Sequence, residues 1–286
     1  MKISYFSTTV DNITQHIIRL NEYQYEYFVS GSSDKVLIAF NGFGKGAEEV
    51  FFFNDAFKKH KVISINLLYH GNSFPISKKK EAINDEHLRC LMLSIAEKEK
   101  FKEFSLFGYS LGGKIALKIV ELFPQNIDKI ILLAPDGIKL NTWYNLATKN
   151  ILCKAIFRFV IKKPAILFFT STLLVKLGII KKSTDKFMRL QMDSLQKRKM
   201  VYNVWMVYPY IIPHLLEIKK LIQQYGINCL LIYGKYDSII PAKIAHRFTR
   251  NCEKFISLKV LELGHNLFHE KTKKHLTLFL KQKKEA

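Results

Sequence analysis

The sequence contains few cysteines, and their positions limit what the protein can be. Its 286 residues include four of them, all far apart: Cys90, Cys153, Cys229 and Cys252. No two have the spacing of a metal-binding or redox pair, so we expect reduced, mostly buried thiols and a cytoplasmic location. The sequence also lacks an internal repeat and a flexible linker between domains.

Long apolar runs are missing as well. The most apolar stretch is PAILFFTSTLLVKLGII at 164–180, and Lys176 interrupts it. A membrane-spanning helix needs about 20 mostly apolar residues, so we predict none here. The first residues, MKISYFSTTVDNITQ, have neither the apolar segment nor the cleavage pattern of a secretory signal.

Acidic residues are scarce, because 24 Asp and Glu face 45 Lys and Arg and leave a net charge of +21. Residues 149–200 alone contain 13 Lys and Arg and two Asp, a net charge of +11. Such an excess suits nucleic acid, an anionic membrane or acidic ligands. No nucleic-acid-binding motif is present, so we expect no nucleic-acid partner. Two readings stay open: weak peripheral contact with the inner face of an anionic membrane, or lysines that only solubilise the chain.

Short, nearly continuous apolar runs are what the sequence does contain. They are rich in β-branched residues, which is typical of strands covered on both faces of a parallel sheet. Segments with helical spacing separate them, at 46–59, 82–100, 111–123 and 242–254, so we predict an α/β fold built from βαβ units. One or two antiparallel edge strands are expected within the first thirty residues. The predicted strands cover 35–40, 61–67, 103–107, 128–134, 227–233 and 256–263.

The interval between the fourth and fifth predicted strands does not follow this alternation of strands and helices. It contains no clear buried strand and is helical in character. We predict a helical cap inserted at 139–224, between a first part of the core at 1–138 and a second at 225–286. The aromatic side chains of the insertion suggest an apolar lining, although each could equally pack the cap on the core: Trp143, Tyr144, Tyr202, Trp205, Tyr208 and Tyr210.

The segment LFGYSLGG at 106–113 places one serine, Ser110, among three glycines. A predicted strand precedes it and a predicted helix follows at once, so the chain must turn sharply. Small neighbours relieve the crowding of such a turn and leave the serine side chain exposed at the end of the strand. This is the G-x-S-x-G nucleophile elbow in its expected strand–turn–helix context.

A serine nucleophile needs a base and an acid that orients the base, in the chain order serine, acid, histidine. Asp237 follows the strand at 227–233, and His265 follows the strand at 256–263. Both therefore lie at the edge where open α/β sheets build their sites. Asp136 also follows a strand and is a rival acid, but we favour Asp237, which could alternatively cap the helix that follows it.

Acyl transfer also needs N–H donors for the oxyanion. The N–H of Leu111 comes directly after the serine, and the glycine-rich loop AFNGFGKG offers the N–H of Phe43. Gly42 and Gly44 allow the unusual backbone path that this requires. A phosphate-binding P-loop is excluded, because GFGKG lacks the spacing and the Ser or Thr.

These motifs together resemble the α/β-hydrolase superfamily, in its cap-bearing branch of esterases, lipases, thioesterases and meta-cleavage product hydrolases. NGFG is similar to the family's H-G-F-x turn, with Asn41 in place of histidine, and YHGNS at 69–73 to its G-H-G-x-S. GKYDSIIP and GHNLFHE resemble its acid and histidine loops, although Thr272 stands where a proline is common. In that pattern His70 is usually structural and holds the loop near the oxyanion turn.

The resemblance implies a serine hydrolase that cleaves a small carboxylic ester or thioester, with an apolar acyl group and no metal or organic cofactor. Family members that act on haloalkanes or epoxides use an aspartate nucleophile, whereas this chain has Ser110. The alternatives are a C–C bond hydrolase, a cofactor-free haloperoxidase or an acyltransferase on the same triad, or a non-catalytic binding protein of the same fold.

Overall fold

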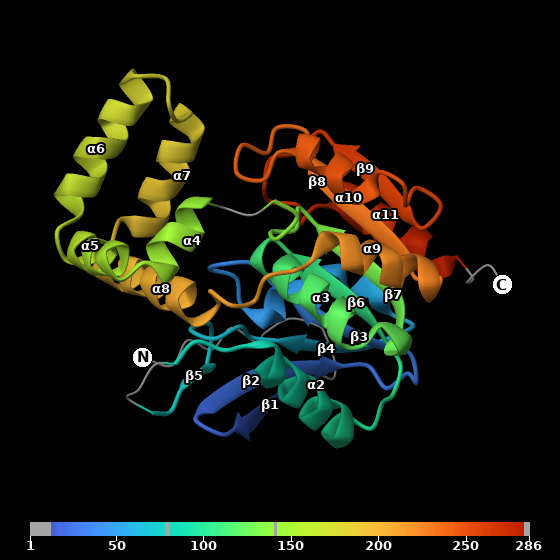
Figure 1. Ribbon diagram of the computed structural model, residues 1–286. Coiled ribbons are helices and arrows are strands. Elements are labelled where there is room, and N and C mark those ends of the chain that lie inside the picture. The colour runs from blue at the N-terminus through green and yellow to red at the C-terminus, as the bar shows by residue number, and fades with distance from the viewer. Residues whose placement is uncertain (1–12, 78–80, 140–141, 283–286) are drawn as a thin grey trace.

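A computed structural model describes residues 13–77, 81–139 and 142–282 and shows a mostly parallel sheet with helices on both faces (Figure 1). Within these residues the sheet has nine strands, in the order β1-β2-β4-β3-β6-β7-β8-β9, and β5 pairs with β2. The strands are β1 Ile13–Leu20, β2 Tyr23–Ser30, β3 Val36–Phe40, β4 Lys61–Ile65, β5 Phe74–Pro75, β6 Phe104–Tyr109, β7 Ile127–Leu133, β8 Asn228–Gly234 and β9 Ile256–Leu261.

The six apolar runs of the sequence form the parallel part of the sheet. Neighbours from β4 to β9 pair in parallel, and β1 and β2 add the expected antiparallel edge. Every residue of β3 and β6 is buried, because helices cover both faces of these central strands. The predicted α/β fold, a mostly parallel sheet with helices on both faces, is thus confirmed. The expected absence of a secretory signal concerns mostly residues 1–12, which lie outside the described part.

Two helical layers enclose the sheet. Helices α2 and α9 both pack against α3 on one face, and α1 and α11 pack together on the other (Figure 1). α3 is buried along most of its length, which fits its apolar sequence LGGKIALKIVEL. The helices of the two layers and their short 3₁₀ turns are η1 Ala47–Phe53, α1 Asn54–Phe57, α2 Asp85–Glu99, α3 Leu111–Leu122, η2 Pro124–Asn126, α9 Leu215–Gln224, η3 Ala242–Ala245, α10 His246–Thr249 and α11 Glu270–Lys281.

The segment between β7 and α9 forms a helical lobe at one side of the molecule (Figure 1). Its helices are α4 Thr142–Lys149, α5 Ile151–Lys162, α6 Pro164–Lys176, α7 Lys182–Met192 and α8 Leu195–Val207. The buried guanidinium of Arg198 joins three of them, because it donates to the carbonyls of Ile161 and Met192, both at 2.9 Å. α9 packs on α3 instead, and the division of the chain at 139 and 224 stays a prediction.

No helix among the described residues combines the length and the apolar character needed to cross a bilayer.

Candidate active site

Ser110 occupies the turn between β6 and α3. Its backbone has φ 51° and ψ −116°, a conformation that costs about 1–3 kcal/mol for a residue with a side chain. The surrounding structure holds this turn, because the Ser110 N–H donates to the carbonyl of Leu133 at 3.0 Å. The Ser110 carbonyl accepts from Gly113 at 2.9 Å and from Asp136 at 2.8 Å. The side chain therefore stands at the carboxyl edge of the sheet, as the sequence predicts.

The glycines around Ser110 are required by close backbone contacts. A Cβ on Gly112 would lie 2.0 Å from the carbonyl oxygen of Phe40 at the end of β3, and one on Gly113 would lie 2.5 Å from Cβ of Pro135. A Cβ on Gly108 would lie 2.7 Å from Cα of Gly113. Only glycine lets α3 begin this close to the strands, so the spacing of the motif has a steric cause.

The structure brings the three triad candidates together. Nε2 of His265 lies 3.1 Å from Oγ of Ser110, and Nδ1 of the same ring lies 2.7 Å from Oδ2 of Asp237. The three side chains come from the loops after β6, β8 and β9, which meet at one edge of the sheet. Both distances fall in the hydrogen-bond range expected between a nucleophile, its base and the group that orients the base.

The Asp237 carboxylate is enclosed and fixed by the loop that carries it. Its side chain is fully buried, and Oδ1 accepts the N–H groups of Ile239 and Ile240 at 2.8 and 2.9 Å. The second oxygen is thereby left to face His265. Asp136 lies elsewhere, with Oδ1 accepting the N–H of Gly137 at 2.8 Å. The geometry favours Asp237 over Asp136 as the partner of the imidazole.

Tyr109 contacts His265, and the sequence did not predict this contact. Its hydroxyl donates to the carbonyl of His265 at 3.1 Å, and the two rings lie 5.4 Å apart. Burial and the nearby Asp237 carboxylate raise the pKa of Tyr109 well above its usual value, so the hydroxyl keeps its proton. Its position directly before Ser110 in the sequence could have indicated that it lies close to the site.

The loop after β3 lies directly against the elbow. A Cβ on Gly42 would stand 2.9 Å from Cβ of Ser110, so Phe43 follows at the rim of the site. Among the described residues, the hydrogen bonds outside helices and strands include none donated by the N–H of Phe43 or of Leu111. The N–H of Leu111 belongs to the first turn of α3, which has no acceptor within the helix. Both predicted oxyanion donors therefore lie in segments next to Ser110, namely the loop after β3 and the first turn of α3.

His70 holds this loop in place. Its Nε2 accepts the N–H of Gly44 at 2.9 Å, and its ring meets that of Phe43 edge to face at 5.8 Å. Because Nε2 accepts, the proton of the neutral ring is on Nδ1, which donates to the carbonyl of Leu68 at 3.3 Å. Burial lowers the pKa of His70, which keeps the ring neutral. These contacts fit the structural role implied for it.

A buried carboxylate fixes the next loop, and the sequence analysis did not single it out. Glu26 accepts from the side chains of Gln15, Asn66 and Asn72 and from the Asn72 N–H. A Cβ on Gly71 would lie 2.1 Å from Oε2 of Glu26. This network ties the YHGNS segment to β2. Through His70 it also supports the loop that carries Phe43. A lone Glu in β2, a strand that lies between β1 and β4, gave no sequence signal of this role.

The helical lobe reaches the site through Phe43. The Phe43 ring packs both against the main core and against the small core of the lobe, which includes Ile161, Met192 and Val201. Aromatic and sulfur-containing side chains complete this small core: Phe157, Phe168, Met188, Tyr202 and Trp205. Of the predicted lining residues, Tyr202 and Trp205 therefore pack against the same small core as Phe43. Tyr208 is instead buried in the main core. The side chain of Trp143 lies outside the described part.

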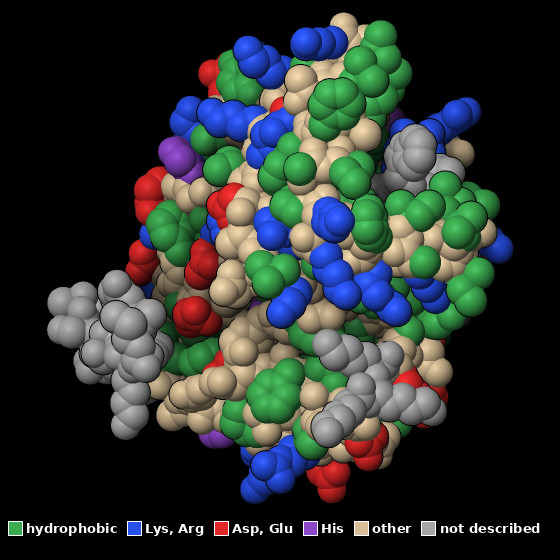
Figure 2. Space-filling model, turned by 90° about the vertical axis from the view of Figure 1, so that its left-hand side faces the viewer, with side chains coloured by type: hydrophobic (Ala, Val, Ile, Leu, Met, Phe, Trp, Pro, Cys, Tyr) green, Lys and Arg blue, Asp and Glu red, His purple; other side chains and the backbone are tan. Residues whose placement is uncertain are grey.

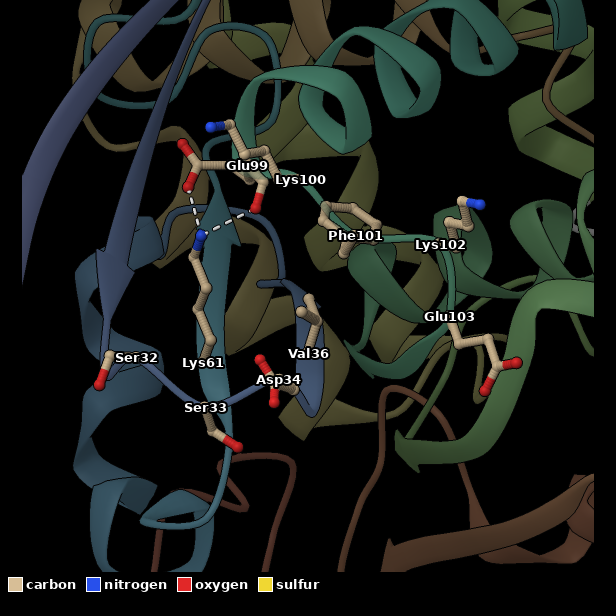
Figure 3. A pocket seen from close by; sticks show the side chains of 10 residues that line it. All are labelled: Ser32, Ser33, Asp34, Val36, Lys61, Glu99, Lys100, Phe101, Lys102 and Glu103. Atoms are coloured by element: carbon tan, nitrogen blue, oxygen red, sulfur yellow. Dashed lines mark hydrogen bonds and ion pairs between the residues drawn. The ribbon is translucent and has the colours of Figure 1, made fainter.

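A hollow of about 380 Å³ lies at the end of the sheet opposite to Ser110 (Figure 3). Its lining includes Val36 at the start of β3 and Lys61 at the start of β4. Lys61 closes one side, because its ammonium lies 2.8 Å from the Glu99 carboxylate and 3.0 Å from the Glu99 carbonyl. Ser110 lies beyond the other ends of these parallel strands, so this hollow takes no part in its site.

Neither geometry nor composition assigns a metal here. Among residues 13–77, 81–139 and 142–282, no three His, Cys, Asp or Glu side chains are grouped as a metal site would require. The absence of a cofactor stays a prediction from the sequence.

Comparison with known proteins defines the class that this fold and site indicate. Residues 35–272 match the family described as "alpha/beta hydrolase fold", and the chain belongs to that family. A 115-residue segment is 27% identical to a Haemophilus influenzae protein named "Putative esterase/lipase" and covers 40% of this chain and 39% of that relative. The chain thus spans well under half of the curated relative it matches.

Solved structures with little sequence identity share the whole fold. MGS-M2, an α/β-hydrolase enzyme from a Medee basin deep-sea metagenome library, matches with a TM-score of 0.68 and 16% identity, over 95% of this chain and 99% of its own. The carboxylesterase CesB of Bacillus subtilis has a TM-score of 0.62 and 15% identity, over 94% of this chain and 92% of its own. A bromoperoxidase of Bacillus anthracis has a TM-score of 0.64 and 15% identity, over 94% of this chain and 100% of its own. At these identities the likeness concerns the fold alone.

Proposed function

We propose that this α/β hydrolase cleaves carboxylic esters or thioesters through Ser110, His265 and Asp237. The observation that carries the proposal is the continuous hydrogen-bonded chain from Oγ of Ser110 through both nitrogens of His265 to the buried Asp237. A serine is a weak nucleophile without such a base. The esterase named among the similar structures and the matched H. influenzae protein agree with this chemistry.

In this mechanism, Oγ of Ser110 attacks the carbonyl carbon while Nε2 of His265 takes the hydroxyl proton. Asp237 holds the ring so that Nδ1 carries its proton toward the carboxylate, and it stabilises the imidazolium that forms. His265 then returns a proton to the leaving alcohol or thiol. In the second half, a water attacks the acyl-enzyme with His265 again as base, which frees the acid and Ser110.

The N–H groups of Phe43 and Leu111 are proposed to bind the oxyanion. Each such donor is worth roughly 10²–10³ in rate, provided that it points at the developing charge. His70 and Glu26 act on this step only indirectly, because they hold the loop that carries Phe43. They are therefore positioning residues.

The acyl group is proposed to be apolar. The support is the side chain of Phe43, which packs against the same small core of the lobe as Phe157, Phe168 and Trp205. Charged acyl groups would lose hydration beside these rings without gaining a partner. The helical lobe would then act as the cap that selects the acyl chain.

Two measurements test this function. A fluorophosphonate probe should label the wild-type protein and fail to label Ser110→Ala, and failure to label the wild type would favour a non-catalytic binding protein. A panel of p-nitrophenyl esters and acyl-thioesters of increasing chain length should then show which leaving group and chain are preferred. Activity on a vinylogous 1,5-diketone substrate, with none on any ester or thioester, would point to C–C bond hydrolysis instead.

A further inference from the structure

The helical lobe exposes an unusual number of large apolar side chains. Ile151 is 86% exposed, Phe169 is 73% exposed, and Leu152 is 67% exposed. We call the whole set the outer lobe surface: Ile151, Leu152, Ile156 and Phe159 on α5, Ile166, Phe169 and Leu173 on α6, and Leu177 and Ile179 in the turn after α6. Apolar residues scattered singly on a surface are ordinary, but a concentration of this kind marks an interaction site.

The spacing of these residues forms two stripes. Leu152, Ile156 and Phe159 recur along one side of α5, and Ile166, Phe169 and Leu173 recur along one side of α6. The opposite sides of the same helices are already used, because Phe157 and Ile161 of α5 and Phe168 of α6 pack in the small core of the lobe. The outer stripes therefore do not stabilise the lobe itself.

Basic residues surround the stripes. Lys162 and Lys163 lie where α5 meets α6, and Lys176 ends α6. None of these three takes part in an ion pair with another described residue. Both aspartates of residues 149–200 are already paired: Asp185 with Arg189 inside α7, at 2.8 Å, and Asp193, between α7 and α8, with Lys197 of α8, at 2.7 Å. The uncompensated charge on this side is thus positive.

Figure 2, which views the molecule from the side of the lobe, shows apolar and basic side chains next to one another across this face. An anionic lipid surface offers both interactions that such a mixture requires. Apolar side chains enter the boundary between headgroups and acyl chains, and lysines lie at the level of the anionic headgroups.

We propose that the outer lobe surface docks on anionic lipid membranes. A second copy of this chain fits the surface less well, because a twofold contact would set a basic patch against itself. The docking does not depend on the proposed hydrolysis. Phe43 packs against the small core of the lobe, to which Ile161 of α5 and Phe168 of α6 contribute, so docking would bring the Ser110 site close to the bilayer, where acyl substrates are concentrated.

Vesicle co-sedimentation of the full chain tests the docking. We expect binding to phosphatidylcholine vesicles that contain phosphatidylglycerol, at low salt, and little binding to phosphatidylcholine alone. High salt should weaken the binding, because it screens the lysines. Each lysine at an anionic surface contributes about fivefold in affinity, so Lys162→Gln, Lys163→Gln and Lys176→Gln together should cost roughly 100-fold.

A matched charge control separates this patch from the overall charge. The triple variant Lys58→Gln, Lys102→Gln and Lys254→Gln removes the same charge from exposed lysines elsewhere and should leave binding nearly unchanged. Equal losses in the two triple variants would mean that only the net charge of the protein matters, which contradicts a docking surface.

An apolar pair of variants tests the stripes. Phe169→Ser with Leu173→Ser should weaken binding at least about tenfold, since the bilayer no longer buries these side chains. Leu93→Ser with Val260→Ser removes comparably exposed residues, 54% and 47%, outside the lobe and should have little effect. Thermal unfolding of each variant checks that it is folded.

Besides equal losses in the two triple variants, two further outcomes would overturn the proposal. One is equal and negligible sedimentation with both kinds of vesicle at low salt. The other is a wild-type dimer in solution that dissociates in Phe169→Ser with Leu173→Ser while no vesicle binding is seen, which would assign the surface to a second copy of the chain.

Discussion

Nε2 of His70 accepts the N–H of Gly44 at 2.9 Å, and this one hydrogen bond links the YHGNS loop to the loop that carries Phe43. The two loops follow β4 and β3, which are neighbours in the sheet. The position of the Phe43 N–H therefore depends on a side chain that does not touch the substrate.

Replacing His70 should slow the reaction without removing the triad. We expect His70→Ala to lower kcat by up to about 10², because small misplacements of a positioned group cost that much. In His70→Gln a side-chain carbonyl can still accept the Gly44 N–H, so the loss should be smaller. Kinetics on a p-nitrophenyl ester measure both, with His246→Ala as a surface control. Equal kcat in His70→Ala and wild type would show that the contact does not position the donor.

The two candidate acids can be ranked by matched substitutions. Asp237→Asn should lower kcat/KM by about 10⁴, because an asparagine favours the wrong imidazole tautomer. Asp136→Asn should cost far less, since its amide oxygen can still accept the N–H of Gly137. Steady-state kinetics on both variants decide the matter, and the reverse ranking would move the acid to Asp136.

Lys114 should make stability depend on pH in the alkaline range. It is buried, it donates to the Tyr208 carbonyl at 3.2 Å, and it lies 4.5 Å from the centre of the Tyr144 ring. Burial lowers its pKa from 10.5 to about 8. The nearby Asp136 carboxylate raises the pKa in part, and the Lys149 ammonium lowers it slightly further. Between these values the unfolded chain binds more protons than the folded one, so this group makes the free energy of unfolding rise as pH rises.

The difference between wild type and Lys114→Met isolates this effect. Relative to the variant, the wild type should gain roughly 3 kcal/mol in free energy of unfolding from below pH 8 to above pH 10.5. Urea titrations across that range measure it. Lys58→Met, at an exposed position, should run parallel to the wild type. A parallel curve for Lys114→Met as well would show that the ammonium is not desolvated in the folded state.

The sequence predicted those parts of the fold that depend on local pattern. The continuous apolar runs at 35–40 and 103–107 became β3 and β6, because strands buried on both faces cannot alternate with polar residues. The two-residue strand β5 had no such pattern, since Phe74 and Pro75 are too short a run to alternate, and they pair with residues about fifty positions earlier, in β2. Some helix starts in the lobe do have a local signal, since Asn150 caps α5 and Ser194 caps α8.

The site was predictable where a motif has a steric or chemical cause. The glycines of GYSLGG relieve contacts as short as 2.0 Å, so their spacing identifies the elbow. By contrast, Glu26 meets Asn66 and Asn72 across about forty residues of sequence, and only the folded chain brings them together. Phe43 was identified through its backbone, while its packing against the lobe depends on helices far along the chain.

The most direct test of the account is the reactivity of Ser110 itself. Its Oγ lies 3.1 Å from Nε2 of His265, and the proposed chemistry begins with that proton transfer. The account predicts that Ser110→Ala folds like the wild type and loses hydrolysis of its best p-nitrophenyl or thioester substrate by about 10⁶ in kcat. A folded Ser110→Ala variant that retained more than about a tenth of wild-type activity would contradict it, because the nucleophile would then lie elsewhere.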